Sequence, residues 1–347
     1  MILNAYAVLD GFLALVRLLL AILLVSLTLS ALRREGRSIS SEERSLFEDH
    51  CYLVVLLGGV LLVLNLASWP FFYLLLQSYV KEWPGVMCIY GVTQVGLESY
   101  GLSRFLPGLV KTLQVLKPVL VFASGSWFVL YLVNRRTATA PLWTRVLWVI
   151  LGVGMLAALD AAAEAAYLAI PKKEATLAVG CCAEAFDADA RATRYLPHAL
   201  LGENYYPQLY RTFWGSNGFM LLALAACIGM IHSGRSLAWL AGLLPGAVLC
   251  AVVNAVFLVE IAAPALLHLP YHHCPYDLVP EVPESVLGIA LFVLAIFCIG
   301  WACVVGGLGN TPETRPFARQ TVVKVLSLGL FAYLSSLVVM SVELALV

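Results

Sequence analysis

Four cysteines and two histidines stand in the polar segments that separate long apolar stretches of this chain. They are Cys88, Cys181, Cys182, Cys274, His272 and His273. Thiolate sulfur and imidazole nitrogen are the ligands that copper and zinc prefer. Thiols that face an oxidising compartment usually pair as disulfides. These residues therefore predict a soft-metal site or two disulfides, with thiol–disulfide exchange coupled to a membrane quinone as a third interpretation.

Each interpretation has its own physical argument. Adjacent cysteines seldom bond to each other, so the disulfide interpretation links one cysteine of the 181–182 pair to Cys88 and the other to Cys274. The metal interpretation uses the same sulfurs together with the two adjacent histidines. Thiol exchange has the least support, because no C-x-x-C spacing occurs. The sequence leaves all three open.

Five ionisable residues fall deep within apolar stretches, where a charge is costly unless it is paired or hydrated. They are Arg17, Lys117, Asp160, Glu164 and Glu260. At about 1.5 Å of helix per residue, the first three lie about 17 Å from the outer end of their spans, and the two glutamates about 10 Å. Asp10 lies near an outer end. We expect the five to form a polar network in the membrane, serving either as structural ion pairs or as an ion or proton path.

The elements that must hold these residues are membrane helices. Of the 347 residues, 61% are hydrophobic and 12% charged, the formal net charge is zero and the mean hydropathy is +0.90. Soluble domains carry about 25% charged residues, and a nucleic-acid binder would carry a basic surface that this composition does not provide. Stretches of about 20 apolar residues cross a bilayer as helices. The composition predicts an all-α integral membrane protein in contact with the lipid bilayer.

Eight stretches reach the length of a membrane span, within one polytopic domain over 1–347 that includes a long loop at 172–212. The spans are approximately 5–31, 51–79, 106–134, 142–171, 213–233, 237–266, 285–306 and 321–347. Arg and Lys are densest in the loops that follow the first, third, fifth and seventh spans, which predicts that these loops are cytoplasmic. Both termini and the Cys/His segments are then extracytoplasmic, and we expect the protein in the inner membrane of a bacterium.

One short pattern occurs twice. P-x-x-x-C-x-Y describes residues 84–90 and again residues 270–276, at an offset of 186. The same offset carries the span 51–79 onto 237–265, which suggests a four-span unit repeated once in parallel. Cys88 and Cys274 would then occupy equivalent positions in the two repeats.

No motif identifies a reaction. The chain has no C-x-x-C-H motif for covalent haem, no nucleotide-binding motif and no G-x-S-x-G, so catalytic residues are unknown and an enzyme that acts by itself is disfavoured. Handling or transport of copper or zinc fits the Cys/His segments. The alternative is a non-catalytic subunit of a larger membrane complex, whose disulfide-linked outer loops bind an electron-transfer or enzymatic partner. A quinone-coupled thiol oxidoreductase is a second alternative.

Overall fold

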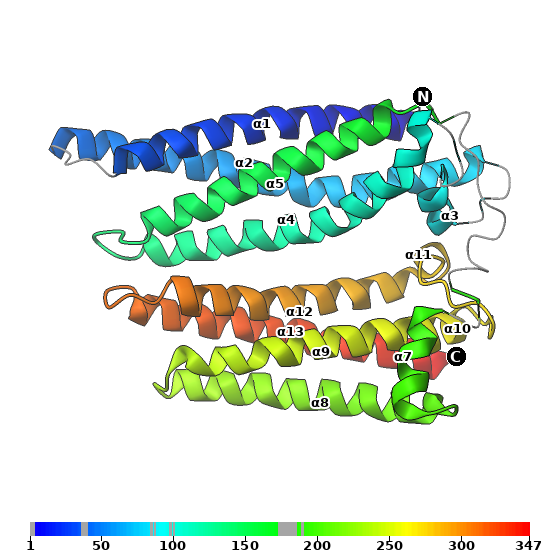
Figure 1. Cartoon of the computed structure of the whole chain (residues 1–347). Helices are drawn as coiled ribbons and strands as arrows, with labels where there is room; N and C mark the ends of the chain where they lie inside the picture. The colour runs from blue at the N-terminus through cyan, green and yellow to red at the C-terminus, as the bar shows by residue number, and fades with distance from the viewer. Residues whose placement is uncertain are drawn as a thin grey trace. The chain divides into compact units, whose positions relative to one another are not determined.

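The computed structural model describes residues 4–35, 41–83, 86, 88–96, 99, 101–172, 186–188 and 191–347. In these ranges the regular elements are helices, and no strand occurs. Eight of the helices are long and apolar enough to cross a membrane (Figure 1). The prediction of an all-α membrane protein with eight spans is confirmed at this level. Large apolar side chains such as Leu15, Leu19 and Ile22 remain exposed along these helices, as contact with lipid requires.

The chain divides into two compact units, and a single polytopic domain over 1–347 stays a prediction. The units are Met1–Val179 (unit 1) and Gly180–Val347 (unit 2). The spanning helices of unit 1 are α1 (Ala5–Glu35), α2 (Ser41–Tyr79), α4 (Leu106–Asn134) and α5 (Trp143–Ala169). These helices pack in the closed order α1, α2, α4, α5, and α2 and α5 also make a smaller contact with each other. The 3-10 helix η1 (Val80–Glu82), α3 (Ile89–Gln94) and the 3-10 helix η2 (Gly101–Phe105) lie between α2 and α4.

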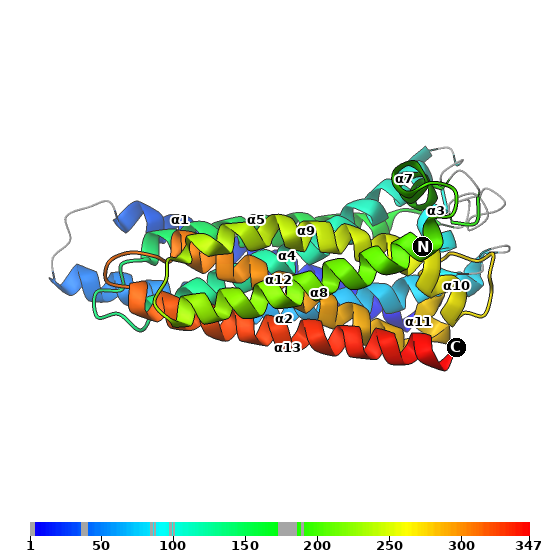
Figure 2. The same cartoon turned by 90° about the horizontal axis from the view of Figure 1, so that it is seen from below.

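Unit 2 is also a bundle of four spans, which run side by side in both views (Figure 1 and Figure 2). Its long helices are α8 (Tyr205–His232), α9 (Leu240–Phe257), α12 (Pro283–Leu308) and α13 (Arg315–Leu346). They pack in the closed order α8, α9, α12, α13. The shorter elements are α7 (Ala192–Leu201), η3 (Leu237–Trp239), α10 (Ala263–Leu266) and α11 (Leu278–Glu281).

Part of the long loop predicted at 172–212 is helical. Helix α7 lies within it, and α8 begins at Tyr205 although the span was expected from residue 213. Pro207 does not prevent this early start, because the first N–H groups of a helix have no partner inside it and a proline there loses no bond. Polar residues such as Arg211 lower the hydropathy of these first turns, so apolar length alone placed the boundary too late.

The sixth span is interrupted by a π-helical segment. Residues Leu258–Ala262, labelled η4, continue α9 with wider turns and lead into α10, where Pro264 stands at the start. Glu260 is the central residue of this segment and is buried. Short π segments inside α-helices occur frequently at functional sites, which directs attention to the contacts of Glu260.

Candidate functional site

Four of the five predicted intramembrane charges meet inside unit 1. Arg17 of α1 pairs through Nη2 with Asp160 Oδ2 and through Nη1 with Glu164 Oε2, at 3.1 Å in the second case. Lys117 Nζ of α4 lies 2.6 Å from Glu164 Oε2 and 3.3 Å from Asp160 Oδ2. All four side chains are almost completely buried. Each carboxylate of α5 therefore contacts both cations, and the four charges balance.

Helix α2 supplies the neutral partners of this network. Arg17 Nε donates to Asn65 Oδ1 at 3.0 Å, and Lys117 Nζ donates to Ser68 Oγ at 3.4 Å. The same Lys117 ammonium lies 5.1 Å from the centre of the Phe72 ring, a distance at which the ring face attracts a cation. All four spans of unit 1 thus contribute side chains to one buried centre.

Asp10 adds a third carboxyl group, which sequence reasoning had placed near the outer end of its span and left out of the network. Its side chain is fully buried beside Glu164. Neither of its oxygens accepts a hydrogen bond from a donor in the described ranges. Asp10 precedes Arg17 by seven residues, about two helical turns, so the two lie on one face of α1. That spacing was the signal in the sequence that could have identified it.

The second oxygen of each α5 carboxylate also lacks a hydrogen-bond donor among the described residues. Asp160 Oδ1 and Glu164 Oε1 are buried and have no hydrogen-bond donor among the residues that the structure describes. The cations thus satisfy one oxygen of each α5 carboxylate and leave the other available. With Asp10, the centre has three buried carboxyl groups, and the cations that the structure places in contact with it are Arg17 and Lys117.

Lys172 lies at the C-terminal end of α5 in unit 1. Its Nζ donates to the carbonyl oxygens of Tyr167 and Ile170, at the end of α5, and lies 4.5 Å from the centre of the Tyr167 ring. Trp83 Nε1 donates to the Lys172 carbonyl at 3.3 Å. Burial lowers the pKa of Lys172 to about 8, so this cation sits in an environment with little water.

Glu260, the fifth predicted charge, belongs to a different site in unit 2. Arg191, at the start of α7, binds it at two points: Nε lies 2.8 Å from Oε1 and Nη2 lies 2.7 Å from Oε2. The Tyr205 hydroxyl, in the first turn of α8, donates to Oε2 at 2.6 Å. The depth of Glu260 in its span did not predict the pair with Arg191, because this cation comes from the loop at 172–212.

The predicted ligand His272 is held between two carboxylates. Nδ1 lies 3.0 Å from Asp187 Oδ2, and Nε2 lies 2.6 Å from Asp277 Oδ2. Burial opposes the charged imidazole, but the hydrogen bonds to Asp277 and Asp187 outweigh it and raise the pKa of His272. Both ring nitrogens are thus engaged, and neither is open to a metal.

His273 faces a cation. Its Nε2 lies 3.0 Å from Arg191 Nη2, and burial together with this guanidinium lowers the pKa of His273. The neutral ring therefore accepts a hydrogen bond from Arg191 through Nε2. A metal ion at that nitrogen would have to displace the arginine. In the arrangement that unit 2 adopts, neither predicted histidine offers a free ligand.

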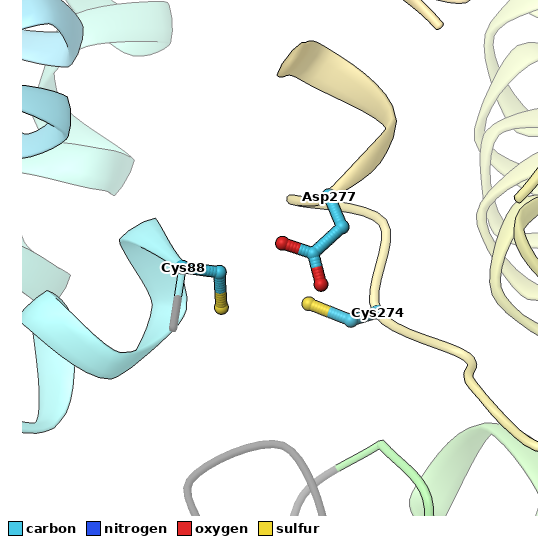
Figure 3. Close-up of side chains that lie close together, drawn as sticks. All are labelled: Cys88, Cys274 and Asp277. Atoms are coloured by element: carbon cyan, nitrogen blue, oxygen red, sulfur yellow. The ribbon is translucent and has the colours of Figure 1, made fainter. Parts of the chain in front are cut away.

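The four predicted cysteines are divided between parts of the chain. Cys88 is buried at the residue before α3 in unit 1. Cys274 is buried in the segment that leads into α11 of unit 2, and its Sγ lies within 4.8 Å of an oxygen of Asp277 (Figure 3). Cys181 and Cys182 lie outside the described residues. The predicted disulfide or metal set therefore remains a prediction.

No protein-family model, curated protein or solved structure matches this chain. The class that the fold defines is an integral membrane protein, with eight helices in the described ranges that are long and apolar enough to span a membrane.

Proposed function

We propose that unit 1 contains a proton-binding centre and that the protein is a proton-coupled membrane transporter. The observation that carries this proposal is Asp10, a fully buried carboxyl group beside Glu164, in a centre where the described residues supply two cations. Ionisable groups inside membrane spans commonly mark ion pathways and proton relays.

Charge balance makes a proton part of this centre. Arg17 and Lys117 neutralise two carboxylates, so a third ionised carboxylate would leave an unpaired charge out of contact with water. Such a charge costs several kcal/mol. One proton held by Asp10 or Glu164 removes the charge and supplies the donor for a hydrogen bond between these two neighbouring carboxyl groups. A proton held there can pass between the two groups.

A purely structural role explains only part of this geometry. Ion pairs of Arg17 and Lys117 with the two α5 carboxylates would fix the register of α1, α4 and α5 without any transport. Asp10 adds no such pair, because no described donor reaches its oxygens. Burial of the Asp10 carboxyl group destabilises the folded bundle if the group has no role beyond structure. It serves a purpose if the bundle binds and releases protons. This difference favours the transport interpretation.

The test compares Asp10→Asn with wild type in liposomes that contain a pH-sensitive dye. A potassium diffusion potential, negative inside, should drive proton uptake by wild type, and Asp10→Asn should reduce it at least tenfold. Infrared spectra should show a protonated-carboxyl band in wild type that Asp10→Asn removes. Glu284→Gln is the matched control, since Glu284 is exposed at the start of α12; it should change neither signal.

Two results contradict the proposal. One is undiminished proton uptake by folded Asp10→Asn protein. The other is the absence of a protonated-carboxyl band from wild type at neutral pH, which needs no variant and so is informative even where the substitution prevents folding.

Soft-metal handling by the outer cysteines is the second candidate that the sequence predicts. The engaged nitrogens of His272 and His273 would leave copper or zinc to sulfur ligands. Thiols should be counted on non-reduced protein, with metal analysis alongside. Four blocked outer cysteines without metal would remove this candidate. That result favours a complex subunit with disulfide-linked outer loops.

We also infer that the two units arose by a parallel duplication. In each unit the first span packs on the second and the fourth, and the third packs on the same two. A short helix follows the second span of each unit, with a cysteine at or close before its start: Cys88 before α3 and Cys274 before α11. This order supports the offset of 186 in the sequence.

Labelling of single cysteines placed at both ends of the chain tests the extracytoplasmic position that the charge pattern predicts for the termini.

A further inference from the structure

A cavity of about 230 Å³, partly open at the surface of unit 2, lies among α8, α9, α12 and α13, and Ala255 of its lining is exposed. Aromatic rings of Phe213, Phe257 and Phe292 form part of its wall, and Phe213 and Phe257 stack with their centres 3.8 Å apart. The side chains that line it with polar atoms are those of Asn254 and Ser336. A mostly apolar cavity with a few fixed polar groups is the usual form of a small-molecule site.

A chain of hydrogen bonds orients the Asn254 amide. Asn217 Nδ2 donates to the Phe213 carbonyl at 2.7 Å, which identifies Asn217 Oδ1 as an acceptor. This oxygen accepts from the Tyr333 hydroxyl at 2.6 Å and from Asn254 Nδ2 at 3.0 Å. Asn254 Nδ2 also donates to the Cys250 carbonyl at 2.7 Å. Both Asn254 amide hydrogens are therefore used.

The groups left to the cavity are acceptors. Asn254 Oδ1 receives no hydrogen bond from the residues described in unit 2, and Ser336 Oγ donates its hydrogen to the Gly288 carbonyl at 2.7 Å. A ligand that matches them must carry a hydrogen-bond donor. Water is a poor match, because a stable buried water needs two to four polar partners, and apolar surface surrounds these two.

The volume of the cavity and its aromatic lining restrict the class of ligand further. An apolar cavity of about 150 Å³ holds one benzene molecule, so this larger cavity suits a substituted ring. Phenyl walls favour an aromatic ring through stacked or edge contacts. We propose that unit 2 binds a lipid-soluble compound with a hydroxylated aromatic ring, of the alkylphenol or alkylhydroquinone class, whose hydroxyl donates to Asn254 Oδ1.

The test measures equilibrium binding of radiolabelled decylhydroquinone and of its dimethyl ether to the full chain in lipid nanodiscs. Both probes carry the same ring and tail, but the ether has no donor. Wild type should bind the hydroquinone about fivefold more tightly, as one hydrogen bond of about 1 kcal/mol implies. Asn254→Leu should abolish this preference, whereas a preference due only to the size of the ether would persist in it.

Two further variants locate the bound ring. Ala251→Phe places a phenyl group in the cavity and should abolish binding of both probes. Val252→Phe adds the same group at the next residue, which is exposed on α9, and should leave binding unchanged. Equal affinities of wild type for both probes overturn the proposal, as does a co-purified acyl chain that the hydroquinone does not displace. The affinity ratio is measured on each protein separately, so it remains valid where a variant folds poorly.

Discussion

Arg191 binds Glu260 through two parallel hydrogen bonds of 2.8 and 2.7 Å. The arginine precedes α7, and the glutamate is the centre of the π-helical segment of the sixth span. The segment before α7 is thereby attached to the sixth span at its π-helical segment. Planar two-point contacts of this kind require the fork of donors that arginine presents.

Arg191→Lys should loosen α7. A lysine keeps the charge but loses the two-point contact, and a lost charge-assisted hydrogen bond costs about 1.5–3 kcal/mol. Hydrogen exchange of the α7 amides should therefore accelerate by about tenfold or more. Arg211→Lys, at an exposed position of α8, should leave α7 unchanged. Equal exchange rates in Arg191→Lys and wild type would show that the contact does not hold this helix.

The hydrogen bonds that hold His272 between Asp187 and Asp277 should weaken at alkaline pH. Despite burial, hydrogen bonds to Asp277 and Asp187 raise the pKa of His272 above its ordinary 6.5. The folded state therefore holds the proton more tightly than the unfolded state. The resulting stabilisation is complete below about pH 6.5 and is lost as the pH rises through the folded-state pKa.

Hydrogen exchange around His272, corrected for its intrinsic pH dependence, should thus accelerate above that pKa. His272→Gln should remove this pH dependence, and His198→Gln, at an exposed position of α7, should retain it. A pH profile that is identical in wild type and His272→Gln would contradict the assignment.

Arg17→Met should strongly destabilise unit 1. The substitution leaves Asp160 and Glu164 with Lys117 as their one remaining cation, and removal of one partner from a buried ion pair costs about 3–5 kcal/mol. The double variant Arg17→Met, Glu164→Gln restores the charge balance and should recover part of this loss. Unfolding in mixed micelles measures the difference, with the exposed Arg33→Met as control. A double variant no more stable than the single one would refute charge imbalance as the cause.

Gly154 should tolerate a side chain much less well than Gly152. A Cβ at residue 154 would lie 2.8 Å from Val25 Cγ2 of α1, whereas a Cβ at residue 152 meets no atom within 4 Å. Valine is stiff in a helix, so Val25 cannot turn aside easily. We expect Gly154→Val to cost about 1–3 kcal/mol more than Gly152→Val, measured by the same unfolding assay. Both variants change helix propensity by the same amount, so a difference near zero would exclude close α1–α5 packing.

The sequence alone predicted much of the buried centre in unit 1. Apolar length identified the spans, and the depth of Arg17, Lys117 and Asp160 along their helices predicted that they could meet; the structure places Asp160 in contact with both cations. Depth was sufficient there because α1, α4 and α5 pack in one bundle. The sequence did not predict Asp10 as part of the buried centre, because a position near the end of a helix allows contact with water.

Tertiary structure decided the rest. Glu260 has a depth similar to that of Glu164, yet it lies in the other unit and pairs with Arg191 from a loop. His272 and His273 had the chemistry of metal ligands, and contacts with Asp187, Asp277 and Arg191 occupy their nitrogens. A linear pattern gives the depth and face of a residue on its own helix. Which helix or loop covers that face depends on packing between segments far apart in the chain, and no local spacing records it.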